Sequence, residues 1–300
     1  MLSPGLLGNG MRNWKTAIAA TIVLLAPGFP SAAANQRLIE KAEMSMLVTG
    51  GIDMRPDGSV ERYSLDHPDK LSQAITQMIG AQVSQWRFEP TNVDGKPVAA
   101  HTNISLRIVA KPVDEQNFNV RIQSASFSGG SGAKDERISV AKKTSLAPMV
   151  RALMSAGTDA AELYLALKIG KDGQVLDAVV EQVNLYALGD EGWMAQARKI
   201  LGKSAVYSVR QWTFAVPAHE PPEGEEYWSG TLPISFQMGD GSSPDLQEDE
   251  EWRMYIPGPC APVPWRMHDK DGRCGGDAAP EGVLTLDSSG PKLLTPLMQG

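Results

Sequence analysis

The feature that most constrains this chain is an ordered set of short signals that occurs twice. Each set starts with alternating apolar residues, continues through an Asp-Gly turn, and reaches a Trp-x-Phe triplet that precedes another alternating run. The triplets are Trp86 to Phe88 and Trp212 to Phe214. Because the order of strand, turn and helix signals is kept, the sequence predicts one small structural unit present in two copies.

The first copy reads as a strand, a turn, a return strand, a helix and a final strand. The turn is Asp57-Gly58, which is a strong hairpin signal between alternating runs. From Pro68 to Trp86 apolar residues recur at every third or fourth position, which predicts an amphipathic helix that begins at the proline. The run NISLRIV then alternates again and predicts the final strand.

The second copy follows the same order with a longer helix. Its first strand is AELYLALKIG, its turn is Asp172-Gly173, and its helix ends near Trp212. A short helix is expected at 148–156, before the first strand. The final strand TLPISFQM contains Pro233, which cannot donate to a sheet ladder and therefore favours an edge position.

Taken together, these signals resemble the TonB C-terminal domain family, with the second copy more divergent. The resemblance covers about half of the chain. It implies an α+β fold of two TonB C-terminal-like domains, each a small antiparallel three-stranded sheet with a packed helix, followed by an irregular tail. The residues that carry it are Asp57-Gly58, Trp86 to Pro90, Asp94 to Pro97, the strand 103–109, Pro148 to Gly157, Asp172-Gly173, Trp212 to Phe214 and Leu232 to Phe236.

The expected domain organisation has five parts. They are a signal peptide at 1–34, a first TonB C-terminal-like domain at 35–112, a linker with an additional strand at 113–146, a second such domain at 147–239, and a low-order acidic, Pro- and Gly-rich tail at 240–300.

The N-terminus has the pattern of a secretory signal. Arg12 and Lys15 precede an apolar run from Thr16 to Ala26, and small residues at Ala32 and Ala34 follow. The run is short for a membrane span, which needs about 20 residues. We therefore expect cleavage after Ala34 and a periplasmic protein of a Gram-negative cell envelope. An uncleaved anchor is the alternative, and only in that case is the membrane a partner.

Charge and cysteine content narrow the classes further. The net charge of −7 argues against nucleic acid as a partner, because phosphate binding needs a basic face. The two cysteines, Cys260 and Cys274, form an even pair in a chain that we expect to be exported. A structural disulfide is therefore predicted. A redox or metal pair is the alternative, although no CxxC motif is present.

No catalytic residue, cofactor or metal site is predicted. The four histidines fall in no HExxH pattern, and the chain has no GxSxG motif or phosphate loop. His101 lies next to a turn and is expected to be a solvated loop residue. The sequence therefore predicts a protein that is not an enzyme.

The two Trp-x-Phe pairs have a structural interpretation. A three-stranded sheet with one helix hides little apolar area by itself. Trp86 and Trp212, at the helix ends, can cover the open corner of each sheet, while Phe88 and Phe214 begin the extended chain that follows. An aromatic binding cage is the competing interpretation.

The family resemblance implies binding rather than chemistry. Such domains bind short extended segments of outer-membrane receptors in the periplasm, partly by adding a strand at a sheet edge. Because the strand 102–109 contains no proline, we expect its edge to be the binding site. The expected partner-binding residues are Thr102, Ile104, Leu106 and Ile108.

Two other functions remain open at this stage. The first is an energy-transducer component of the TonB type, although only residues 35–41 separate the signal from the first strand and no Pro-rich spacer is present. The second is an unrecognised periplasmic hydrolase. A hydrolase would need a deep pocket lined by acids with shifted pKa values or by a histidine.

Overall fold

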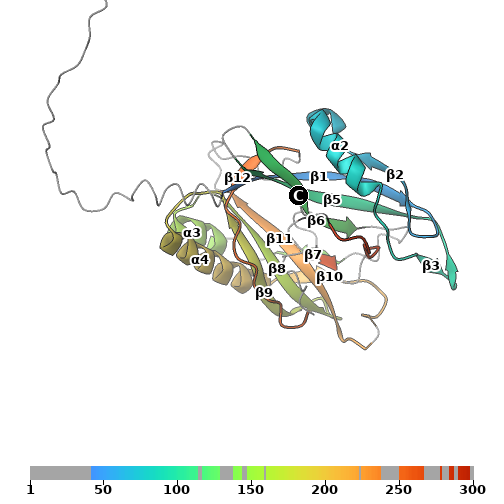
Figure 1. Cartoon of the computed structure of the whole chain (residues 1–300). Coiled ribbons are helices and arrows are strands. Elements are labelled where there is room, and N and C mark those ends of the chain that lie inside the picture. The colour runs from blue at the N-terminus through green and yellow to red at the C-terminus, as the bar shows by residue number, and fades with distance from the viewer. Residues whose placement is uncertain are drawn as a thin grey trace, which may run out of the picture.

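The computed structural model describes residues 42–113, 117–128, 138–143, 147–158, 160–222, 224–237, 250–266, 278, 284–286 and 290–297. This part of the chain is a mixed α+β fold of mostly antiparallel sheets with few helices (Figure 1). The strands are β1 (Glu43–Met54), β2 (Val60–Leu65), β3 (Asn92–Val93), β4 (Lys96–Pro97), β5 (Ala100–Pro112), β6 (Phe118–Ser128), β7 (Ser139–Lys142), β8 (Ala160–Gly170), β9 (Val175–Leu185), β10 (Thr213–Ala215), β11 (Tyr227–Gln237), β12 (Arg253–Tyr255) and β13 (Thr285–Leu286). The helices are the 3-10 turn η1 (Pro68–Lys70), α2 (Gln73–Val83), α3 (Ala147–Ala156) and α4 (Glu191–Val209).

The first unit consists of β1, β2, α2 and β5. Strand β1 is central, with β5 along one side and β2 on the other, and β12 extends the β2 side. Helix α2 begins later than the sequence predicts. Pro68 starts the 3-10 turn, and Ser72 caps α2 by accepting a hydrogen bond from the Ile75 N–H at 3.4 Å. Ile75, Ile79 and Val83 then face the sheet.

The second unit consists of β8, β9, α4 and β11, with β8 in the central position. Asp190 caps α4 by accepting a hydrogen bond from the Trp193 N–H at 2.8 Å. Helix α3 packs against α4 on the same side of the sheet. The short helix and the hairpin that the sequence predicts here are both present.

The Asp-Gly turns form at the predicted positions, and the two units use them identically. Gly58 and Gly173 have positive φ values of 78° and 77°. Their carbonyl oxygens accept hydrogen bonds from the N–H groups of Phe88 and Phe214, each at 2.8 Å. A Cβ atom at either glycine would collide with the carbonyl oxygen of that same phenylalanine. Only glycine therefore lets the Trp-x-Phe segment approach the hairpin turn so closely.

Both sheets are larger than the predicted three strands. Strand β6 pairs with the outer edge of β5, so the strand expected in the linker 113–146 belongs to the first sheet. From the expected low-order tail 240–300, β12 pairs with β1 and β13 pairs with β11. Much of the tail is therefore part of the fold. The sequence did not indicate this because β12 and β13 have three and two residues, too few to show a period.

The two units exchange strands with each other. After β6 the first unit continues into β7, which pairs with β10, the Trp-x-Phe segment of the second unit. After β13 the second unit continues to Leu293, which bridges to Phe88, in the Trp-x-Phe segment of the first unit. Each unit thus completes the other, and the two cannot be separated at the predicted linker without breaking sheet pairing.

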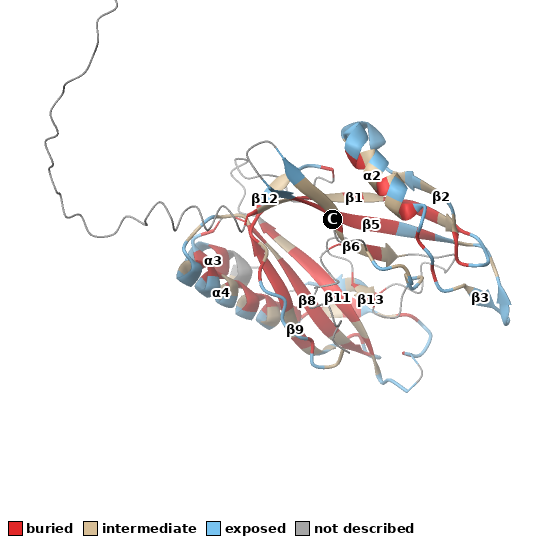
Figure 2. Ribbon diagram, in the orientation of Figure 1, coloured by how far each residue is buried: buried red, intermediate tan, exposed pale blue. Residues whose placement is uncertain are grey.

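The sheets face each other through the sides that carry no helix (Figure 1). Arg107 on β5 donates to the Glu162 carboxylate on β8 at 2.9 Å and to the Tyr164 hydroxyl at 2.8 Å. The Tyr186 hydroxyl donates to the other Glu162 oxygen at 3.3 Å. Burial, with a further contribution from Glu162, raises the pKa of Tyr186 well above its usual range. The strands around this contact are largely buried (Figure 2).

None of the described helices is both long and apolar enough to span a membrane. The predicted signal peptide, 1–34, lies outside the described residues.

Candidate functional site

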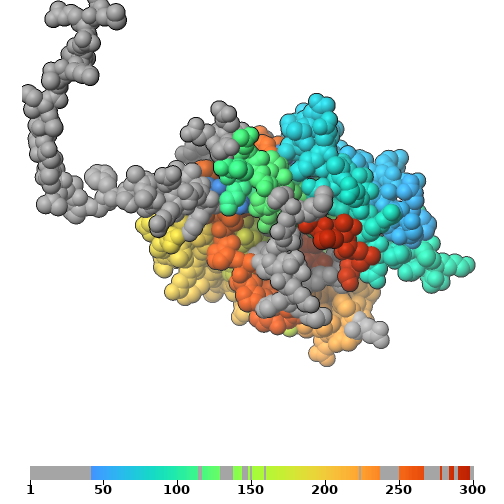
Figure 3. Space-filling view, viewed as in Figure 1, coloured from blue at the N-terminus to red at the C-terminus, as the bar shows by residue number. Residues whose placement is uncertain are grey.

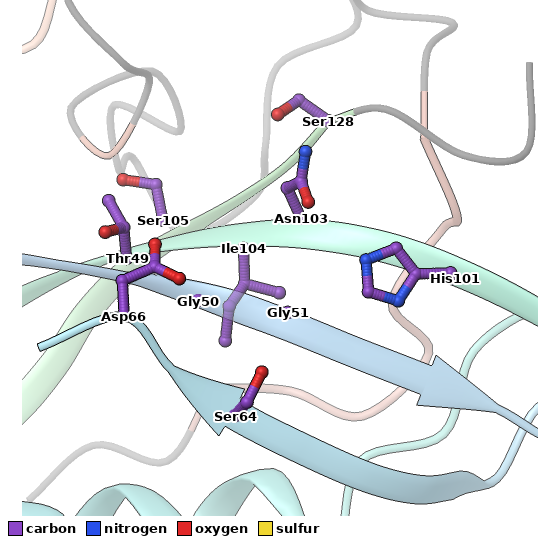
Figure 4. A pocket seen from close by; sticks show the side chains of 10 residues that line it. All are labelled: Thr49, Gly50, Gly51, Ser64, Asp66, His101, Asn103, Ile104, Ser105 and Ser128. Carbon is purple, nitrogen blue, oxygen red and sulfur yellow. The ribbon is translucent and has the colours of Figure 1, made fainter. Parts of the chain in front are cut away.

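A pocket of about 410 Å³ lies on the first sheet, and its lining includes Ser105, two residues before Arg107 on β5. Four strands contribute to it, and its lining is mainly polar (Figure 4). The lining residues are Thr49, Gly50, Gly51, Ser64, Asp66, His101, Asn103, Ile104, Ser105 and Ser128.

Strand register explains why these residues lie together. Ser64, Gly51, Asn103 and Ser128 are successive partners across β2, β1, β5 and β6. They form one transverse row of small or polar side chains on the face opposite α2, because side chains alternate between the two faces of a strand. Gly51 provides no side chain in the middle of this row. The missing side chain leaves room for the His101 ring at that point.

Three hydrogen-bonded side chains, Asp53, Arg62 and His101, border the pocket. His101 Nδ1 lies 2.7 Å from Asp53 Oδ1, and Arg62 donates to Asp53 Oδ2 through Nε at 3.0 Å and Nη2 at 2.6 Å. These hydrogen bonds, first that of His101 and then those of Arg62, hold the pKa of Asp53 below its usual value. The His101 ring lies over Gly51, where a Cβ atom would be 2.9 Å from its Cε1 atom.

The Ser105 hydroxyl group in the pocket makes no hydrogen bond within the described residues. Ser105 is buried, and no hydrogen-bond partner for its Oγ atom is present within the described part of the chain. Ser126, the β6 partner of Ser105, is also buried, and its Oγ atom has no hydrogen-bond partner among the described residues. A buried hydroxyl without a partner costs about 1–3 kcal/mol.

The second candidate site is the outer edge of β6. In the described residues the first sheet ends at this strand, which is 11 residues long and contains no proline. Part of the strand lies at the surface of the molecule (Figure 3), while Ile122, Ser124 and Ser126 are buried. Phe118, at its start, is 52% exposed. Natural edge strands are often protected by lysine or proline. The only charged side chain of β6, Arg121, instead lies 3.4 Å from Glu43.

The prediction that the edge of strand 102–109 binds a partner is wrong. This strand is β5, which lies between β1 and β6, so both of its edges are paired. The four residues expected to contact a partner are instead buried inside the protein, and the three aliphatic ones pack against the α2 side of the sheet. They are Thr102, Ile104, Leu106 and Ile108. Among the described strands, the outermost one on this side of the sheet is β6.

The Trp-x-Phe residues are core residues in both units. Trp86, Phe88, Trp212 and Phe214 are each at most 3% exposed. The Phe127 ring of β6 packs edge-on against Phe88, with ring centroids 5.0 Å apart, and against Trp86 at 5.8 Å. Such burial leaves no open cage of the kind that the competing interpretation requires.

Cys260 is disulfide-bonded, and no free cysteine occurs in the described residues. Its expected partner, Cys274, lies outside the residues that the structure describes. Within the described part of the chain, no group of three or more His, Cys, Asp or Glu side chains is placed to hold a metal ion.

Sequence reasoning missed the pocket. His101 was expected in a solvated loop, but it lies on β5 and reaches Asp53 on β1. The available signal was the Gly50-Gly51 pair inside an otherwise regular strand, which indicates a close approach or a hollow. Comparison of the chain with protein-family models, with curated proteins and with solved structures finds no match.

Proposed function

We propose that this chain is a non-enzymatic binding module of the periplasm that binds extended segments of envelope or outer-membrane proteins by strand addition. The observation that carries the proposal is the long outer edge of β6, at which the described sheet ends. The resemblance of the duplicated hairpin, helix and Trp-x-Phe order to the TonB C-terminal domain family supports the same mode. The docking edge is β6 rather than the family-like final strand.

The chemistry of β6 suits an added strand. Backbone N–H and C=O groups supply the affinity in this binding mode, and pockets for alternate side chains supply specificity. Phe118 gives an exposed apolar contact at one end of β6, and Ser128 opens into the polar pocket at the other end. A segment bound along β6 would therefore contact the apolar Phe118 side chain at one end of the strand and the Ser128 hydroxyl at the other end.

Site-specific photo-crosslinking in the full chain tests this function. A photoreactive amino acid replaces Phe118 on β6, which is 52% exposed, and the matched control replaces Tyr207, which is 63% exposed and lies on α4. We expect position 118 to crosslink to a defined segment of an envelope protein and position 207 to give no such product. Equal labelling from both positions, or none from position 118, would refute strand addition at β6.

A transducer component of the TonB type is the alternative within the same family resemblance. It requires that the N-terminal segment stays in the membrane. N-terminal sequencing of the exported protein separates the two functions, because a soluble product that begins at Asn35 cannot transmit force from a membrane anchor.

A hydrolase is the second candidate, and the pocket is what favours it. His101 has its Nδ1 atom on Asp53 and its ring over Gly51, and the Ser64 hydroxyl lies on the far side of that glycine. This order of carboxylate, imidazole and hydroxyl is the one that activates a serine nucleophile. No hydrogen bond joins the described His101 and Ser64 side chains. Turnover of activated esters that is lost in His101→Ala would establish this function, and the absence of such turnover would remove it.

A further inference from the structure

The C-terminal segment 290–297 lies on the surface of the first unit as a short added strand. Leu293 forms an antiparallel bridge with Phe88. The Glu89 N–H donates to the Lys292 carbonyl at 2.9 Å, and the Leu294 N–H donates to the Arg87 carbonyl at 2.8 Å. In the space-filling view this red segment rests against the teal residues of the first unit (Figure 3).

The second unit holds a different strand in the equivalent place. There β7 pairs with β10, so that Val140 stands opposite Phe214 as Leu293 stands opposite Phe88. The two occupants come from different parts of the chain and share no sequence beyond an aliphatic residue opposite the phenylalanine. The backbone after each tryptophan is therefore a general acceptor of an antiparallel strand, and its recognition tolerates different sequences.

The contacts in the first unit define what this acceptor recognises. Leu293 packs, partly buried, against the core that contains Phe88, while its neighbour Leu294 is 56% exposed. The Arg87 N–H donates to the Thr295 hydroxyl at 2.8 Å. Gly290 lies so close to the carbonyl oxygen of Phe127 that no side chain fits there. The recognised pattern is a glycine, then an aliphatic residue three positions later, then a hydroxyl two positions after it.

The hold on this segment is weak compared with that on the interior strands. Its described hydrogen bonds to the first unit are the two backbone bonds and the one to Thr295. Each such bond contributes about 0.5–1.5 kcal/mol net. Local opening of an element with so few bonds needs less free energy than global unfolding. The segment can therefore leave while the sheets remain folded.

We propose that residues 87–89, here called the docking segment, bind an extended peptide of a partner protein in place of the chain's own 290–297. The partner segment carries the same glycine, aliphatic and hydroxyl pattern. The chain's own segment acts as a tethered competitor, since a short tether holds it at an effective concentration on the order of millimolar. The site needs the backbone of residues 87–89 and, in the described structure, contacts β6 only where Gly290 meets the Phe127 carbonyl, so strand addition along β6 and peptide binding at the docking segment can fail separately.

The test uses the full chain and a fluorescent peptide with the sequence of residues 290–297. Leu293→Asp in the protein removes the apolar contact of the tethered segment and leaves the docking segment unchanged. The matched control is Leu294→Asp, at the exposed neighbour. We expect the Leu293→Asp protein to bind the peptide at least tenfold more tightly than the wild type, and the control to bind like the wild type. A peptide with the same Leu-to-Asp change should not bind.

Hydrogen exchange at the Glu89 amide reports whether the tethered segment has left. Fast exchange there, with near-ultraviolet circular dichroism unchanged, shows a vacant docking segment in a folded protein. Gly290→Val is the second variant, because it displaces the segment at Phe127 without changing a side chain that packs near Phe88. Equal peptide affinity in wild type and vacated variants would overturn the proposal. So would unfolding of both variants, which would make 290–297 part of the cooperative core.

Discussion

Arg107 gives the sharpest test of how the two sheets are held together. Its side chain is 7% exposed and that of its partner Glu162 is 13% exposed. The guanidinium donates to Glu162, to the Tyr164 hydroxyl and, at 3.3 Å, to the Ser45 hydroxyl on the neighbouring strand. Arg107→Ala leaves a carboxylate between the sheets with only the Tyr186 hydroxyl as a described donor.

The expected loss follows from leaving a buried charge without its counter-charge. Removing one partner of a buried ion pair costs about 3–5 kcal/mol. Arg62 provides the matched control, because it also pairs with a carboxylate, that of Asp53, but is 79% exposed. An exposed pair contributes about 0–1 kcal/mol. Arg107→Ala should therefore lower the free energy of unfolding several times more than Arg62→Ala does.

Urea unfolding of the full chain, followed by tryptophan fluorescence and by circular dichroism, measures both effects. The double variant Arg107→Ala with Glu162→Gln removes the uncompensated charge and should recover part of the loss. A loss below about 1 kcal/mol for Arg107→Ala, equal to that of Arg62→Ala, would refute the view that this pair is buried between the sheets.

Three further outcomes follow from the structure. Gly58→Ala and Gly173→Ala should each cost at least about 1–2 kcal/mol from positive φ alone, and unfolding curves that show a loss at only one site would contradict the equivalence of the two turns. Because the pKa of Asp53 is lowered in the folded state, its stabilisation is present above the unfolded pKa of about 4 and is lost as the pH falls through the lower folded pKa. The difference in melting temperature between wild type and Asp53→Asn should therefore shrink as the pH falls below about 4, and a constant difference would contradict this. Leu106→Ala should cost about 2–5 kcal/mol, against less than about 0.5 kcal/mol for the exposed Leu188→Ala, when both are measured in urea.

Local signals were sufficient for the repeated unit. The Asp-Gly turns, the alternating strands and the amphipathic helix each depend on residues within a few positions of one another. Gly58 and Gly173 are in the turns that the sequence predicts, and Ile75, Ile79 and Val83 form the buried side of α2. The error at the start of this helix came from taking Pro68 as its first residue, although Ser72 is the cap.

Non-local pairing was not predictable in the same way. The run from Phe118 to Ser128 was expected to be an additional strand, but nothing in its residues says that it lies along β5. Because this run pairs with β5, the strand that contains Ile104 and Leu106 lies inside the sheet. The prediction that its edge binds a partner is therefore wrong. Likewise, Asp53 and His101 are unremarkable in sequence, and only the register of β1 with β5 brings them together.

Because strands are exchanged between the two units, the Trp-x-Phe segment of each unit depends on another part of the chain for its pairing. Each Trp-x-Phe segment presents backbone groups that need a partner, and here each unit supplies that partner to the other. The second unit's acceptor is filled by β7, which leads directly towards α3 and the core of that unit. The first unit's acceptor is filled by residues 290–297, which make three described hydrogen bonds to that unit and pack Leu293 and Leu297 against its core. An intruding strand would therefore meet much less resistance at Phe88 than at Phe214, although in both units the phenylalanine N–H donates to the carbonyl of the turn glycine at 2.8 Å.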